Sequence, residues 1–144
     1  MNQHETVKML KEIYRSAKTA MDAISILMPK SNSHEFSLVL EQQMADYQDI
    51  AQQALMQLSG FQELPDDNSV FSMLGMWSAV QLNTVTNKNP DHMAEILISG
   101  STMGLIDMTR FVHSDKGIDG YAVDLGNRLI AAEQKNIDIM RSFL

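Results

Sequence analysis

Cysteine is absent from this chain of 144 residues. Its absence excludes disulfide bonds, thiolate metal sites and cysteine nucleophiles. No apolar run approaches the roughly 18 residues that a membrane-spanning helix needs. The first residues, MNQHETVKMLKEIYR, also lack the basic-then-apolar plan of a signal peptide. We therefore expect a cytoplasmic protein.

Basic residues are few and scattered. Eleven lysines and arginines stand against 18 aspartates and glutamates, which gives a formal net charge of −7. Because nucleic-acid binding depends on neutralised phosphates and anionic membranes attract basic clusters, we expect neither partner. The chain also has no phosphate-binding loop, no dinucleotide fingerprint and no Gly-x-Ser-x-Gly elbow. We therefore expect no catalytic activity.

What the sequence does contain is helical periodicity, because apolar residues recur at steps of three and four. Pro29 ends the first such stretch, Pro90 suits the first helical position of the third, and Gly60 can end the second in the left-handed conformation. A shorter segment, 69–87, is apolar on more than one face. The four long helices predicted in this way cover residues 3–29, 33–59, 90–114 and 118–143.

The spacing of these helices predicts their topology. No strand alternation or internal repeat is found, so we expect one all-α domain over residues 1–144. The short connection between the first two helices makes them antiparallel neighbours. If segment 69–87 returns along the bundle, two antiparallel hairpins are joined by one helical crossover. This is the connection of a ferritin-like four-helix bundle.

Glutamates on these helices resemble part of a metal-binding pattern. Di-iron and di-manganese bundles place one glutamate on each of two helices and Glu-x-x-His on the other two. Two helices here carry a glutamate where that motif would begin, with Met44 and Asn136 in the place of histidine. With the stretches GSTMGLIDMTRF and AAEQKNIDIMRSFL, the chain is similar to small uncharacterised ferritin-like bundle proteins of bacteria. The ligands that this resemblance implies for iron or manganese are Glu12 or Glu5, Glu41, Glu95 and Glu133.

The missing histidines favour a different interpretation. Thioether and amide groups suit iron badly. The apolar spacing also assigns Met44 and Asn136 to the seams of their helices, which leaves Glu41 and Glu133 one position round the helix. We therefore expect these glutamates beside the core, Asn136 buried with its amide hydrogen-bonded, and no bound metal or other cofactor.

Histidines at one end of the bundle offer a second metal site. His92 and Glu95 share a helix face at a spacing of three, and His34 begins another helix at the same end. The more common role of such terminal histidines is that of exposed polar residues. The hypothesis of no metal site is therefore preferred here too.

The most apolar segment suggests association. Trp77, Met73 and Met76 give segment 69–87 more apolar surface than one packing face needs, and these residue types are enriched at interfaces. We expect a two-fold homodimer formed through this segment. The function predicted is that of a non-catalytic bundle acting through self-association or partner binding, with iron or manganese binding as the alternative. No small-molecule ligand is indicated.

Overall fold

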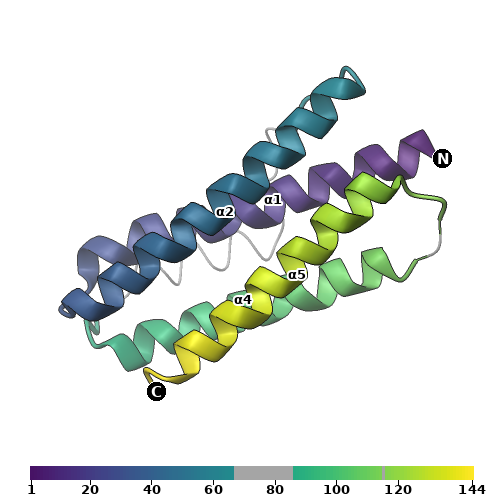
Figure 1. Ribbon diagram of the computed structural model, residues 1–144. Coiled ribbons are helices and arrows are strands. Elements are labelled where there is room, and N and C mark those ends of the chain that lie inside the picture. The colour runs from purple at the N-terminus through teal and green to yellow at the C-terminus, as the bar shows by residue number, and fades with distance from the viewer. Residues whose placement is uncertain (67–85, 115) are drawn as a thin grey trace.

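The computed structural model describes residues 1–66, 86–114 and 116–144, and all of their regular structure is helical. The expected all-α fold is confirmed, and each expected helix agrees within about two residues with the one found (Figure 1). None of the described helices combines the length and apolar composition needed to cross a membrane. The elements in chain order are α1 (Gln3–Leu27), the short 3-10 helix η1 (Met28–Lys30), α2 (His34–Gly60), α4 (Pro90–Val112) and α5 (Gly120–Arg141).

Side-chain caps fix where three of these helices begin. Asn2 Oδ1 accepts the backbone N–H of Glu5 at 3.1 Å, and Ser33 Oγ accepts that of Phe36 at 3.2 Å. Asp119 caps α5 in the same way. These bonds satisfy amide groups that have no partner within the helix. At the other end of α2, Gly60 is the last helical residue, but the left-handed conformation expected there belongs to Gln62, with φ of 58°.

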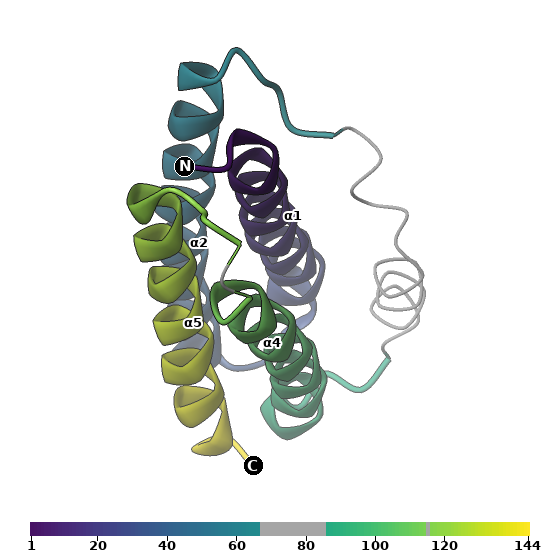
Figure 2. The same ribbon diagram turned by 90° about the vertical axis from the view of Figure 1, so that its right-hand side faces the viewer.

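Neighbouring helices run antiparallel. Arg128 and Lys135 of α5 pair with Asp49 and Asp46 of α2, so the order along one helix is reversed along the other. The start of α4 lies beside the turn after η1, where Asn32 Nδ2 donates to Asn89 Oδ1 at 3.3 Å. The chain between Gly60 and Pro90 therefore joins opposite ends of the bundle, as the crossover topology requires (Figures 1 and 2). The segment 69–87, with Trp77, Met73 and Met76, lies almost entirely outside the described residues.

The core lies between the four helices and is mostly apolar. It departs from the expected seam on α5, where Glu133 and Met140 are buried while Ala132 and Ile139 are only partly so. On α2, Gln43 is likewise buried and Met44 is partly exposed. The fully buried large apolar side chains are Phe36, Met9, Leu10, Ile13, Ile24, Leu27, Leu40, Leu58, Met93, Leu129 and Met140.

One glycine, Gly126, lies where α5 packs tightly against α1 and α4. A Cβ atom on Gly126 would lie 2.6 Å from Cε of Met9 and 3.2 Å from Cγ2 of Val112. Any larger residue must therefore displace side chains of both α1 and α4. Gly100, by contrast, is exposed, and within the described residues no atom beyond its chain neighbours and the nearby backbone of its own helix lies within 4 Å of the position of its Cβ.

These two glycines give a matched test of the packing. We expect Gly126→Val to lower the free energy of unfolding by about 1–3 kcal/mol because the core is overpacked. Gly100→Val makes the same change in helix propensity without new contacts, and should change stability by less than about 0.5 kcal/mol. Urea denaturation of both variants measures the difference. Equal losses in the two variants would show that α5 does not pack as described.

Candidate functional site at the centre of the bundle

Polar side chains gather at the centre of the otherwise apolar core. Gln43 and Tyr47 of α2 lie one turn apart on one helix face, and Glu133 and Asn136 of α5 lie one turn apart on another. All four are at least 96% buried, with exposed fractions of 4%, 2%, 2% and 1%. We call these four residues, with Ser101 of α4, the central polar cluster.

Glu133 is the only acidic residue of this cluster and reaches toward the other helices. The side chains of Ser101 and Tyr47 hydrogen-bond to its carboxyl group. A Cβ on Gly104 would lie 3.6 Å from Oε1 of Glu133 and 3.2 Å from Oγ of Ser16, so the glycine leaves room for this carboxyl between α1 and α4. Burial raises the pKa of Glu133 to about 7, against the smaller opposing effect of the two hydrogen bonds.

Tyr47 links the two helices that carry the cluster. Its hydroxyl accepts a hydrogen bond of 3.0 Å from Nδ2 of Asn136. Burial, and after it the nearby Glu133 carboxylate, raises the pKa of the Tyr47 phenol above its usual value. The phenol therefore stays protonated and can donate to Glu133. The expected burial and hydrogen bonding of Asn136 is confirmed, with Tyr47 as its partner.

Part of the cluster's hydrogen-bonding capacity is unused. Nε2 of Gln43, Oε2 of Glu133 and Oδ1 of Asn136 are buried and have no hydrogen-bond partner in the described part of the chain. Thr6, which is also polar and buried, differs from them. Its hydroxyl donates to the carbonyl of Asn2 at 2.8 Å and accepts the N–H of Asp119 at 2.9 Å.

The expectation that Glu133 lies beside the core is wrong. The burial pattern of α5 runs through Leu129, Glu133, Asn136 and Met140, in steps of four, three and four. The apolar spacing instead favours Ala132 as the residue between Leu129 and Asn136, so expectation and structure agree at Leu129 and Asn136 and differ at Glu133. Glu133 and Asn136 therefore both point inward, where a Glu-x-x-His motif would place its two ligands.

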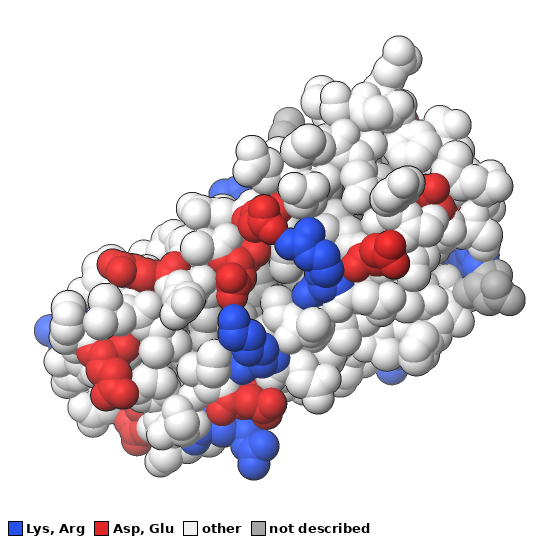
Figure 3. Space-filling model, viewed as in Figure 1, with Lys and Arg blue, Asp and Glu red and all other residues white. Residues whose placement is uncertain are grey.

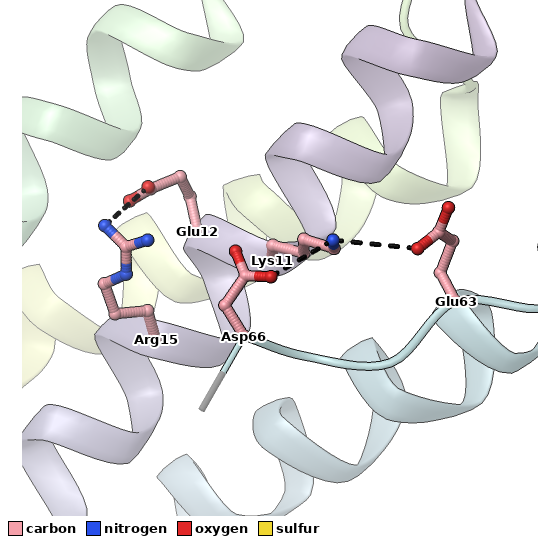
Figure 4. Close-up of polar contacts among 5 residues, drawn as sticks. All are labelled: Lys11, Glu12, Arg15, Glu63 and Asp66. Atoms are coloured by element: carbon pink, nitrogen blue, oxygen red, sulfur yellow. Dashed lines mark hydrogen bonds and ion pairs between the residues drawn. The ribbon is translucent and has the colours of Figure 1, made fainter. Parts of the chain in front are cut away.

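The other glutamates considered as ligands lie elsewhere. Glu41 and Glu95 are exposed, as expected for Glu41. Glu12 lies at the edge of α1, where its Oε1 pairs with Nη1 of Arg15 at 2.9 Å (Figure 4). Next to this pair, Lys11 of α1 forms ion pairs with the segment after α2. Its Nζ lies 3.6 Å from Oε2 of Glu63 and 3.2 Å from Oδ1 of Asp66 (Figure 4). Glu5 is part-buried at the start of α1 and pairs with Lys116.

The histidines do not complete a metal site within the described residues. His34 is exposed and His92 is partly buried, and they begin α2 and α4 at the same end of the bundle. Over residues 1–66, 86–114 and 116–144, no three or more His, Asp or Glu side chains are placed so that they could hold a metal ion. The proposed set of His34, His92 and Glu95 is therefore not brought together.

Gln43 and Ser101 are the members of the cluster that sequence reasoning missed. Gln43 follows Leu40 by three residues and precedes Tyr47 by four, so it shares the helical spacing of these two buried residues. The apolar neighbour Met44 was chosen instead. Ser101 was noted only as part of a helical stretch, and no pattern in the sequence links it to Glu133.

Sequence comparison gives no family. No protein-family model matches the chain, and no curated protein sequence matches it. Its fold, an all-α bundle of four helices in the described part of the chain, matches a ferritin-like four-helix bundle.

A solved structure similar to it is the bacterioferritin-related protein of Bacteroides fragilis, described as a dodecameric thioferritin. The TM-score is 0.77 and the identity 9%, over 99% of this chain and 86% of that chain. At this identity the likeness shows the fold alone.

The buried carboxyl predicts an unusual pH dependence of stability. The unfolded chain loses the Glu133 proton near pH 4.5, whereas the folded chain holds it up to about pH 7. The folded state thus binds more protons between these values, so its stability falls as pH rises through this window and then levels off. The loss due to Glu133 is about 3 kcal/mol, from about 1.4 kcal/mol per pKa unit.

Urea denaturation between pH 4.5 and pH 8 measures this loss. We expect Glu133→Gln to remove this loss, so that the stability of the variant relative to the wild type increases as pH rises. Glu41→Gln, at an exposed position, serves as the control and should follow the wild-type profile. Parallel profiles for the wild type and Glu133→Gln would contradict a buried, titrating Glu133.

Proposed function

We propose that this chain is a ferritin-like bundle whose central metal motif is degenerate, and that it acts by associating with copies of itself and not by catalysis. The observation that carries the association is the uncharged end of α2. Residues 50–62 contain no acidic or basic residue, yet Leu55 and Met56 are 37% and 62% exposed. Tyr121, which is 76% exposed, lies beside this end, where its backbone carbonyl accepts a hydrogen bond of 3.3 Å from Nε2 of Gln57.

Charge favours this end as a contact between copies. Each chain carries a net charge of −7, so identical molecules repel one another over most of their surface. Figure 3 shows the projecting end of α2 without acidic or basic side chains, whereas both kinds follow the middle of the same face. Two copies can meet at this end without placing like charges together. The assembly of the similar Bacteroides fragilis protein into a dodecamer supports association as a use of this fold.

Light scattering after size-exclusion chromatography tests the association. We expect the wild type to have a mass that is a multiple of 16.2 kDa. Met56→Glu should shift this mass toward that of the monomer, because it places a like charge in each copy's contact. Leu38→Glu changes a residue of similar exposure near the other end of α2 and should leave the mass unchanged.

A monomeric wild type at all concentrations would refute self-association. Dissociation by Leu38→Glu but not by Met56→Glu would place the contact elsewhere. A two-fold dimer through segment 69–87 stays a separate prediction, which the same measurement on Trp77→Glu tests.

The side chains that the central polar cluster offers as metal ligands do not fit a paired-metal centre. Such centres combine four inward carboxylates with two histidines. Here the cluster supplies one carboxyl, from Glu133, with Asn136 in the position of histidine. Gln43 and Tyr47 occupy the facing positions of α2 with an amide and a neutral phenol, which are weak ligands for iron.

The second candidate function is that of an iron or manganese protein, and the inward Glu133 carboxyl favours it. Elemental analysis of protein purified without chelator or nickel affinity distinguishes the two. We expect well under one iron or manganese per chain. A stoichiometric content of either metal would overturn the proposed function and favour this second one.

A further inference from the structure

Three unpaired polar atoms at the centre of the bundle require a partner. They are Nε2 of Gln43, Oε2 of Glu133 and Oδ1 of Asn136. Because these side chains are at most 4% exposed, bulk solvent does not reach them. Each buried polar group without a partner destabilises the fold by about 1–3 kcal/mol. Three such atoms in one cluster therefore point to a bound hydrogen-bonding molecule.

The three atoms belong to side chains that are bonded to Tyr47 or lie one turn from it. Asn136 is bonded to Tyr47, and Gln43 lies one turn before Tyr47 on the same face of α2. Glu133 lies one turn before Asn136 and hydrogen-bonds with Tyr47. The hydroxyl of Tyr47 thus contacts both α5 side chains, on the face of α2 that also carries Gln43.

The hydrogen-bonding character of these atoms identifies the molecule. The amide nitrogen of Gln43 is a donor and Oδ1 of Asn136 is an acceptor, whereas the Glu133 carboxyl accepts when it is ionised and can also donate when it is protonated. Water can donate two hydrogen bonds and accept two, so it fits either state of Glu133, and buried waters typically make about three hydrogen bonds to groups that otherwise lack partners. We propose that an ordered water molecule is bound between Gln43, Glu133 and Asn136, and joins α2 to α5 at the centre of the bundle.

A cation is a poorer match for the same atoms. Metal ions bind oxygen and not the amide nitrogen that Gln43 presents, and a divalent ion would keep a net positive charge beside a single carboxylate. The water site rests on the proposed function in one respect: it requires that no metal pair fills the cluster. Elemental analysis tests that requirement separately, so the two proposals can fail independently.

A crystal structure of the wild-type protein at about 1.5 Å resolution tests the water directly. We expect one density peak within about 3.2 Å of all three atoms. No peak would overturn the proposal. A peak with oxygen contacts shorter than about 2.6 Å, with the Gln43 amide turned to present Oε1, would identify a cation and would also overturn it.

A double-mutant cycle tests the same water in solution. Nε2 of Gln43 and Oε2 of Glu133 have no direct hydrogen-bond partner in the described part of the chain, and a water bound to both would couple the two side chains. Each single variant changes the unfolding equilibrium constant by some factor, and without coupling the double variant would show the product of the two factors. We expect the double variant Gln43→Met/Glu133→Gln to differ from that product at least about threefold. The control pair combines Glu133→Gln with Gln42→Met, which lies at an exposed position. Its unfolding equilibrium constant should lie within about twofold of the value expected without coupling. If the unfolding equilibrium constant of the Gln43→Met/Glu133→Gln variant equals the value expected without coupling, the proposal is overturned.

Discussion

The burial of one carboxyl group, that of Glu133, is the constraint on which the centre of this bundle depends. A charged carboxylate in a low-dielectric interior is costly, so it must be protonated or surrounded by donors. Two other helices meet this requirement here: Tyr47 of α2 and Ser101 of α4 hydrogen-bond to the carboxyl, and Gly104 of α4 leaves room for it. A single acidic residue therefore explains why a phenol, a hydroxyl and a glycine lie at one level of an apolar core.

The same contacts fix how the two helical hairpins fit together. The buried bond between Tyr47 and Asn136 joins α2 of one hairpin to α5 of the other in one register. The surface pairs of Arg128 with Asp49 and Lys135 with Asp46 follow that register, but they are about half exposed. Exposed pairs of this kind contribute about 0–1 kcal/mol. A slip between the hairpins would instead separate buried polar groups from their partners, which costs more. The register is thus determined mainly at the centre.

The sequence was sufficient for the helices, their order and the burial of Asn136, because apolar periodicity and cap residues are local signals. It was insufficient for Glu133 and Gln43 for one common reason. Each lies next to a more apolar residue, Ala132 or Met44, and counting apolar residues assigns that neighbour to the seam. The correct phase depends on how α2 and α5 turn toward each other, which is a property of the packed bundle. Ser101 depends on the same packing, because it meets Glu133 only across the space between α4 and α5.

A centre with one carboxyl differs in its charge balance from one with four. Four inward carboxylates repel one another strongly, and only bound cations or several protons can compensate them. One carboxyl is compensated by one proton, and burial has already raised the pKa of Glu133 to about 7, so the proton is held near neutral pH. Neutral donors such as Tyr47 and Asn136 then suffice around it, and histidine is not needed to complete a ligand set. An amide at position 136 and a single inward glutamate among the described residues are therefore consistent with each other, because one proton is enough to compensate the centre.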